Sequence, residues 1–291
     1  MIHTLSTQQW DEQFSDSTLL DAITRLEGGH VLYFPKLAFT LKPEERIFLT
    51  PDYADPHAKN ISYNRQLRKL WGVRALSDQQ HDQLKKMLDR FASSAEQLVK
   101  NILPRYANQL TLARTSFRPL QVSNRKTSYR KDDKRLHVDA FPSAPNQGNR
   151  ILRVFCNINP EGADRVWRLG EPFETIAERF VNQIKPPIPG SAAALRFLRI
   201  TKSYRTAYDH YMLRMHDQMK ADERYQRDSK QQEVRFPPGS SWIVQTDHVS
   251  HAAMQGQYLL EQTFYLPVEA MLDESQAPLR VLEKLLRREL V

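Results

Sequence analysis

The fold is decided by residues 235–267, which read RFPPGSSWIVQTDHVSHAAMQGQYLLEQTFYLP. A Pro-Pro-Gly turn at residues 237–239 leads into a strand-like run, SSWIVQT, and a second run, QYLLEQTFYLP, follows Gly256. β-Branched and aromatic residues favour strands, whereas Pro and Gly favour the turns between them. The polar turn between the two runs carries His248 and His251. We therefore expect two neighbouring strands whose connection presents a histidine.

Further strand-like runs precede this stretch and are separated by Pro, Gly and Asn. One run, at residues 30–35, lies early in the chain, and the others begin near Thr115. Their texture predicts an antiparallel sheet system. The later runs are SFRPLQVS (116–123), SYR (128–130), RLHVDAF (135–141), RILRVFCNIN (150–159) and RVWRLG (165–170).

Helical patterns surround and interrupt the predicted strands. Ser77 is a suitable N-cap, apolar residues then recur at helical spacing, and Pro104 ends the pattern. The fold class is therefore α+β, with a double-stranded β-helix (jelly-roll) core and helices before, within and after it. We expect a single domain. Its parts are a helical and mixed cover (1–114), the β-helix core (115–267) with a helical insert (191–228), and a C-terminal helix (276–291).

The composition excludes several classes of protein. Of the 291 residues, 40% are hydrophobic and 26% are charged, which is typical of a folded protein. No stretch approaches the roughly 20 apolar residues of a membrane-spanning helix, and the first residues lack the features of a signal peptide. Cys156 is the only cysteine, so no intrachain disulfide can form, and nothing in the cysteine content argues against a reducing cytoplasm. The net charge of +8 attracts nucleic acid, anionic lipid or acidic substrates without selecting among them.

His137 and Asp139 stand one residue apart in the run RLHVDAFPS. On a strand, alternate side chains point to the same face, so the imidazole and the carboxylate project together, as two ligands of one metal ion would. A histidine from the distal turn completes a set of two histidines and one carboxylate. That set is typical of non-haem Fe(II) oxygenases, in which the open positions take a bidentate co-substrate and O₂.

Two histidines compete for the third position. We favour His251, because a small residue follows it and Gly256 begins the next strand-like run. His248 directly follows Asp247, closer to the end of the preceding run. The histidine that does not bind would then lie beside the ligands or at the rim of the site.

Four segments resemble the 3-deoxy-D-manno-oct-2-ulosonic acid (Kdo) 3-hydroxylases: HVDAFPS, NRILRVFCNINP, YDHYMLRMHDQMKADERYQ and TDHVSHAAMQGQYLLEQTFYLP. These enzymes are Fe(II)- and 2-oxoglutarate-dependent dioxygenases of Gram-negative bacteria. The resemblance runs from about Leu112 to Pro267 and more weakly through the preceding residues. The segment around His251 and the YDHYMLRMHD helix are its specific parts, because the wider oxygenase superfamily shares the His-x-Asp pattern.

The resemblance implies an iron site at His137, Asp139 and His251, with 2-oxoglutarate and O₂ as co-substrates. It also implies oxidation at C3 of a Kdo sugar, which gives the 3-hydroxylated analogue Ko in the inner core of lipopolysaccharide. The acceptor would be Kdo-lipid A, reached at the cytoplasmic face of the inner membrane. No pattern in the sequence fixes the oligomeric state.

One departure from the superfamily concerns the residue that holds the far carboxylate of 2-oxoglutarate. Most members place an arginine on the strand after the distal histidine, where this chain has Glu261 and Gln262. A buried carboxylate needs a cation, and some members supply it from the strand after His-x-Asp. Arg150 and Arg153 are three residues apart on that run, so they face opposite sides. We expect Arg153 to be the anchor, with Arg150 second and Gln262 with a distant lysine third.

Basic and polar residues on either side of the His-x-Asp segment are candidates for binding the anionic sugar and phosphates. We expect contributions from Arg130, Arg205, Tyr208 and His210. The alternative is a solvated basic loop beside an amphipathic cover helix. Neighbouring basic residues with the same two interpretations are Arg125, Lys126, Lys131, Arg135, Lys202 and Arg214. His216 and Asp217 are adjacent on a helix, so we expect them to diverge and form no second metal site.

Two rival functions remain open at this stage. One is an oxygenase of the same chemistry that acts on a protein or nucleic acid, although no nucleic-acid motif occurs and no such partner is expected. The other is a non-enzymatic, cupin-like binding protein. A peripheral membrane contact through the basic C-terminal helix is a further hypothesis, and its alternative is a helix that packs on the domain.

Overall fold

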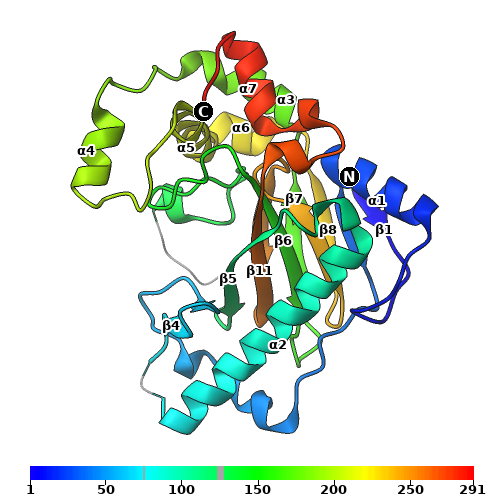
Figure 1. Ribbon diagram of the computed structural model, residues 1–291. Coiled ribbons are helices and arrows are strands. Elements are labelled where there is room, and N and C mark those ends of the chain that lie inside the picture. The colour runs from blue at the N-terminus through cyan, green and yellow to red at the C-terminus, as the bar shows by residue number, and fades with distance from the viewer. Residues whose placement is uncertain (75, 123–127) are drawn as a thin grey trace.

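The computed structural model describes residues 1–74, 76–122 and 128–291, and its strands form a large sheet and a small sheet (Figure 1). All neighbouring strands are antiparallel except the first pair of the large sheet. The large sheet has the order β1 (Ile2–Thr4), β2 (Val31–Phe34), β9 (Ser241–Gln245), β6 (Arg150–Asn157), β11 (Leu259–Leu266), β5 (Thr111–Arg118), β3 (Ile61–Asn64) and β4 (Lys69–Trp71). The small sheet has the order β10 (His251–Gln255), β7 (Arg165–Leu169) and β8 (Gln232–Phe236).

Helices cover one side and one end of the large sheet. The long helix α2 crosses the front of this sheet in Figure 1, and α3, α5, α6 and α7 gather near its end. The α-helices are α1 (Asp16–Glu27), α2 (Asp78–Ile102), α3 (Phe173–Phe180), α4 (Ser191–Phe197), α5 (Ala207–Ala221), α6 (Glu223–Asp228) and α7 (Pro278–Leu286). Short 3₁₀ turns lie at Pro43–Phe48, Pro51–Tyr53, Pro104–Tyr106, Tyr129–Lys131, Val181–Gln183, Val268–Ala270 and Glu274–Gln276.

The central strand β6 separates two packed regions, because alternate side chains point to opposite faces. Leu152 and Val154 pack into the core under the helices, a cluster whose members run from Leu5 to Leu290. Phe155 points the other way, into an aromatic layer between the two sheets, where its ring centroid lies 5.1 Å from that of Trp167. We call these the helix-covered face and the inter-sheet face of the large sheet.

Residues 1–114 contribute more than a cover. Their strands β1 and β2 extend the large sheet beyond β9, and β3 and β4 extend it beyond β5. The boundary expected at residue 115 is therefore not a boundary of the sheet. The predicted strand at residues 30–35 and the Ser77-capped helix are confirmed as β2 and α2, and the Ser77 side chain accepts from the backbone N–H of Gln80.

Several predicted elements were wrong in detail. RLHVDAF is not a strand, because His137 makes one isolated bridge with His251 and the Asp139 N–H then turns to the Thr246 carbonyl at 2.8 Å. SYR is part of a 3₁₀ turn, and β5 ends at Arg118 before Pro119. The expected helical insert is broken into α4, α5 and α6, and the strands β1, β3, β4, β8 and β10 were missed.

The C-terminal helix packs on the domain. Leu279, Val281 and Leu282 of α7 are buried, and Arg280 pairs with Glu274 and Glu283. The apolar side of this helix therefore does not face solvent. Within the described residues, no helix combines the length and the apolar character needed to cross a membrane.

Candidate metal centre

The side chains of His137, Asp139 and His251 are buried or nearly buried and converge, and His251 is the first residue of β10. The isolated bridge holds His137 against His251, with backbone N–O distances of 3.0 and 2.9 Å. Their ring centroids are 4.7 Å apart, and His137 Nε2 lies 3.7 Å from Asp139 Oδ1. Each of the three residues offers a ligand atom within 4.8 Å of the other two. Among the described residues, this is the group of histidine and acidic side chains with the geometry of a metal site.

The hydrogen bonds of the imidazoles leave one nitrogen of each ring for an ion. His137 Nδ1 is 2.7 Å from the Arg135 carbonyl, and His251 Nδ1 is 2.8 Å from the Val249 carbonyl. Each Nδ1 therefore carries the proton in the neutral ring, and Nε2 keeps its lone pair. Burial lowers the pKa of both imidazoles, most strongly that of His137, which favours this neutral form.

Asp139 is ionised in spite of its surroundings. Burial opposes its charge, but the Arg153 guanidinium outweighs burial and holds the pKa of this carboxyl well below its usual range. Its Oδ2 is buried and lies 3.1 Å from Arg153 Nη2, whereas its Oδ1 lies 3.7 Å from His137 Nε2. A buried carboxylate needs countercharges, and an ion held between Asp139 and the two imidazoles would supply a second one.

Arg153 links Asp139 to a second buried carboxylate. Its Nη1 is 3.2 Å from Glu261 Oε1, and Glu261 Oε2 accepts two bonds from the Arg118 guanidinium at 2.9 and 2.6 Å. Burial opposes the charge of Glu261, but Arg118 and Arg153 hold its pKa below the usual value. Two guanidinium groups and two carboxylates thus form one chain of alternating charges on the inter-sheet face.

A small polar cavity, of about 40 Å³, opens at this cluster. Besides the three convergent side chains, it is lined by Lys59, Arg118, Asp133, Arg153, Phe155, Arg165, Trp167 and Ala253. Trp167 stacks on His251 with a centroid distance of 5.1 Å and fixes the plane of that ring. The lining is therefore rich in cations, which suits an anionic ligand.

Gly256 allows one of these cations to approach. The Arg165 Nη1 donates to the Gly256 carbonyl at 3.1 Å, and Gly256 has a φ of +121°. A Cβ at this position would lie 2.7 Å from Arg165 Cδ. Glycine is therefore required here both by the backbone conformation and by the close approach of Arg165.

Helix α5 contributes to the surroundings of the cluster. His216 meets His137 edge to face at a centroid distance of 5.3 Å, and its Nδ1 is 3.0 Å from Asp217 Oδ1. The expected divergence of His216 and Asp217 is therefore wrong, because the two side chains contact each other. Lys220 is buried and donates to the Arg130 carbonyl at 3.2 Å, and burial lowers its pKa to about 8.

The three residues expected near the co-substrate lie in different places. Arg153 is on the inter-sheet face and lines the cavity. Arg150 is fully buried on the helix-covered face, where Asp247 and Gln245 accept from its guanidinium at 2.8 and 2.6 Å. Gln262 is also on that face and accepts from the Thr115 hydroxyl at 2.6 Å. The second and third choices, Arg150 and Gln262, therefore do not line the cavity, because strand alternation turns them away from it.

The four residues expected near the sugar are also separated. Tyr208 lies fully buried in the helix-covered core. His210 Nε2 is 3.0 Å from the Lys185 carbonyl, and Arg205 donates to the Pro142 carbonyl. Arg130 is exposed and pairs with Asp217 on α5. None of the four lines the described cavity, and the predicted contributors Arg125 and Lys126 lie outside the described residues.

His248 and His251 are clearly distinguished. His251 belongs to the convergent group, whereas His248 packs edge to face on Phe173 at 5.8 Å under the helices. Burial, with a smaller effect of Arg150, lowers the pKa of His248 to about 3. His248 is therefore a neutral core residue.

Sequence reasoning missed the partners of Arg153. Arg118 and Glu261 meet because β5 and β11 pair with Leu259 opposite Arg118 and Glu261 opposite Ser116. The alternation of side chains along the two predicted strands was a usable signal, because in this register Arg118 and Glu261 point to the same face of the sheet. The register itself cannot be read from one sequence, and neither can the approach of Lys59 and Arg165.

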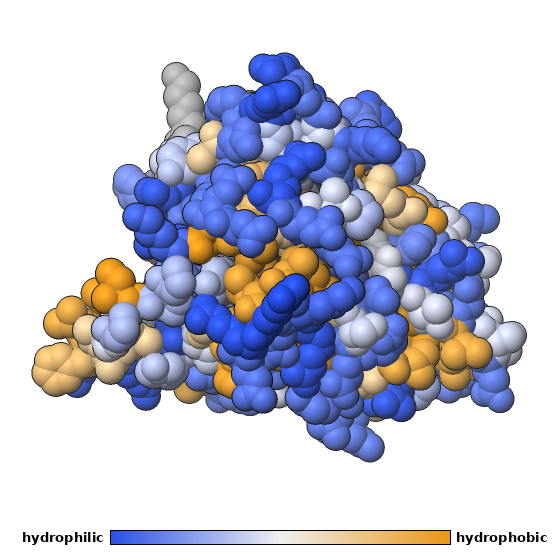
Figure 2. Space-filling view, turned by 90° about the horizontal axis from the view of Figure 1, so that it is seen from above, coloured by the Kyte–Doolittle hydropathy of each residue, from blue (hydrophilic) through white to orange (hydrophobic). Residues whose placement is uncertain are grey.

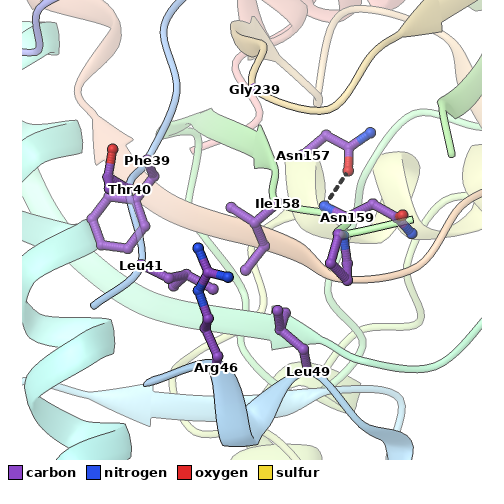
Figure 3. A pocket seen from close by; sticks show the side chains of 10 residues that line it. Phe39, Thr40, Leu41, Arg46, Leu49, Asn157, Ile158, Asn159 and Gly239 are labelled. Carbon is purple, nitrogen blue, oxygen red and sulfur yellow. Dashed lines mark hydrogen bonds between the residues drawn. The ribbon is translucent and has the colours of Figure 1, made fainter. Parts of the chain in front are cut away.

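A larger hollow, of about 340 Å³, lies elsewhere, between the Pro43–Phe48 turn and the end of β6 (Figure 3). Its polar side chains include Arg46 and Asn157, and Asn157 already donates to the carbonyls of Ala163 and Phe236. It shares no lining residue with the polar cavity. The size of a cavity therefore does not identify the candidate centre here, whereas the convergence of ligand atoms does.

The comparisons with known proteins agree with the site. The family model of 3-deoxy-D-manno-oct-2-ulosonic acid (Kdo) hydroxylase matches residues 9–289, and no curated protein sequence matches the chain. The chain is similar to the Kdo hydroxylase KdoO in complex with alpha-ketoglutarate and Fe(III), with 46% identity and a TM-score of 0.96, over 100% of this chain and 97% of that chain. It is similar to the cobalt(II) complex of KdoO with 47% identity and a TM-score of 0.97 over the same shares. The resemblance inferred from the sequence is confirmed.

Proposed function

The chain belongs to the Kdo hydroxylase family and is an Fe(II)- and 2-oxoglutarate-dependent dioxygenase, and we propose that it hydroxylates C3 of the Kdo sugar on Kdo-lipid A to give Ko. The single observation that carries this proposal is the convergence of His137, Asp139 and His251. Solved relatives named Kdo hydroxylase hold Fe(III) with alpha-ketoglutarate or with succinate. The alternative of a non-enzymatic binding protein is wrong, because the family consists of hydroxylases.

His137, Asp139 and His251 would hold the iron. The donor set fits this metal, because two neutral imidazoles and one carboxylate are the ligands of non-haem Fe(II) oxygenases. The bound iron, with 2-oxoglutarate and O₂, supplies the oxidative chemistry that hydroxylates a C–H bond. The protein holds Nε2 of each imidazole toward one point through the carbonyls of Arg135 and Val249, and it orients His251 through Trp167.

Arg153 would anchor a carboxylate of 2-oxoglutarate. It lies 3.1 Å from Asp139, and its planar group can bind a carboxylate with two parallel bonds. In this proposal Arg153 exchanges its contact with Glu261, at 3.2 Å, for one with the co-substrate. Arg118 retains two bonds to Glu261, so that carboxylate stays paired during the exchange.

The sugar would approach from the side where Arg130 and Lys59 are exposed. Both are cationic, as is required for an acceptor that carries carboxylate and phosphate groups.

We further propose that the two sheets form a double-stranded β-helix in one domain. Two observations support this: the aromatic layer joins the sheets, and the helix-covered core includes residues near both ends of the chain. We place the enzyme in the cytoplasm, working at the inner membrane.

The test is succinate release by the full chain with Fe(II), 2-oxoglutarate and three acceptors: Kdo-lipid A, a peptide mixture and single-stranded nucleic acid. Turnover stimulated by Kdo-lipid A alone, with the product carrying one additional oxygen at C3, supports the proposal. Stimulation by peptide or nucleic acid without stimulation by Kdo-lipid A would contradict it and favour the rival oxygenase.

A further inference from the structure

Residues 185–205, which we call the arm, leave the body of the protein and return to it. The arm contains α4, which stands apart from the sheets at the left of Figure 1. No residue of this seven-residue helix is buried. A helix this short is unstable in water by itself, and most helices are stabilised by packing of an apolar face. The arm therefore carries a helix without the packing that normally stabilises one.

Large apolar side chains are exposed on the arm. The exposed fractions are 87% for Phe197, 76% for Ile188 and 63% for Leu198, and Ile200 and Tyr204 are also exposed. Figure 2 shows hydrophobic side chains gathered on the lobe that projects at the left, where α4 lies in Figure 1. Contiguous apolar groups of this kind on a folded protein mark a surface that contacts a membrane or a partner.

The charge of the arm selects among possible partners. The sequence has no Asp or Glu between Ile184 and Tyr208, and its basic residues there are Lys185, Arg196, Arg199, Lys202 and Arg205. Two copies of such a segment repel each other. Large apolar side chains flanked by Lys and Arg are typical of segments that lie in the interface of an anionic bilayer. The charge thus favours an anionic lipid surface over a second copy.

The arm is joined to the loop that follows Asp139. The Lys202 N–H donates to the Ser143 carbonyl at 2.9 Å, and the Ser203 hydroxyl donates to the Pro145 carbonyl at 3.1 Å. The Arg205 guanidinium donates to the Pro142 carbonyl. An object bound to the arm is therefore held at a fixed position relative to the candidate metal centre.

We propose that the arm is the membrane-contact element of this enzyme. Phe197, Leu198 and Ile188 enter the interfacial region of an anionic bilayer, and the flanking Lys and Arg residues contact its headgroups. In this arrangement the lipid-anchored sugar is presented to the cavity. The choice of acceptor rests on the function proposed above, whereas the lipid contact itself does not.

The test is co-sedimentation of the full chain with vesicles that contain no Kdo. One set is phosphatidylcholine alone, and the other is phosphatidylcholine with phosphatidylglycerol. We expect binding to the anionic set only, and less binding when salt rises from about 0.05 M to about 0.5 M. The double substitution Phe197→Ser/Leu198→Ser should lower the partition at least about tenfold, because two large apolar side chains are lost from the lipid contact.

The matched control is Leu67→Ser, because Leu67 is 67% exposed between β3 and β4, outside the arm. It should bind vesicles as the unchanged chain does. Equal binding by the arm variant, or equal binding to neutral vesicles, would overturn the proposal. A dimer that forms without lipid, and that the substitution Phe197→Ser/Leu198→Ser abolishes, would also overturn the proposal. The vesicles carry no acceptor, so vesicle binding and hydroxylation are tested separately. A chain that binds anionic vesicles but does not hydroxylate Kdo-lipid A would contradict the proposed function and support the membrane contact of the arm.

Discussion

The two faces of the large sheet carry the same types of residue in two different arrangements. On the helix-covered face, Arg150 and Asp247 are completely buried and paired at 2.8 Å, and His248 lies near them. On the inter-sheet face, Arg153 and Asp139 are 3.1 Å apart, and His251 lies beside them.

The difference lies in what else each group can bind. The Arg150 guanidinium has Asp247, Gln245 and the sulfur of Met271 as partners, and none of these residues lines the polar cavity. On the inter-sheet face, Arg153 and Asp139 border a cavity that is lined by further cations. An Arg-Asp-His set therefore indicates stability when it is closed by its own partners, and function when it borders a cavity.

The largest expected difference between the faces is in activity. His251→Ala should abolish hydroxylation, a loss of more than about a hundredfold, since even losing a hydrogen-bond partner of a metal ligand lowers activity roughly 10–100-fold. His248→Ala should retain most activity, because His248 packs on Phe173 away from the cluster. Succinate release under saturating Fe(II) measures both. Activity in the His251 variant with loss in the His248 variant would reverse the assignment.

The second difference is in stability. Arg150→Met should lower the free energy of unfolding by about 3–5 kcal/mol, because it leaves the Asp247 carboxylate buried without its cation. The double variant Arg150→Met/Asp247→Leu should recover much of this loss, since neither charge then remains. Urea denaturation followed by circular dichroism measures both variants. A double variant no more stable than the single one would show that the pair is not a closed unit.

The third difference concerns the co-substrate. Arg153→Ala should raise the KM for 2-oxoglutarate about 10–100-fold, the equivalent of one charge-assisted bond, and change the KM for the sugar much less. Arg25→Ala on α1 is the control, because its pair with Asp21 is on the surface. If both constants rise together in the Arg153 variant, Arg153 serves to position Asp139 rather than to bind 2-oxoglutarate.

The smallest difference is in the pH dependence of stability. The pKa of His248 is about 3 in the folded protein, below the unfolded value of about 6.5, so the unfolded state binds more protons below pH 6.5. Stability from this residue is therefore present above pH 6.5 and falls as pH decreases, by about 1.4 kcal/mol at about pH 5.5. Between about pH 7 and 5.5, the free energy of unfolding of His248→Leu should therefore fall by about 1.4 kcal/mol less than that of the unchanged protein. Urea denaturation at each pH measures this, and parallel curves of the free energy of unfolding against pH would contradict a buried, neutral His248.

The sequence predicted elements whose pattern is local. Helix α2 and strands β6, β9 and β11 lie close to their predicted positions, because apolar periodicity and capping residues act over a few positions. Strand β10 was missed, because HAAMQ has small and polar residues, and its role comes from pairing with β7. The same non-locality explains the overlooked Arg118–Glu261 pair and the buried position of Tyr208, whose helix turns it into the core.

The assignment of the metal site to His137, Asp139 and His251 is tested most directly by measuring metal binding. Anaerobic titration with Co(II), followed by its visible absorption, should show one ion bound per chain in the unchanged protein and in His248→Ala. Asp139→Ala and His251→Ala should each lose this absorption while keeping the unfolding midpoint of the metal-free protein. Tight binding of one Co(II) by both of these variants would contradict the assignment of the metal site to His137, Asp139 and His251.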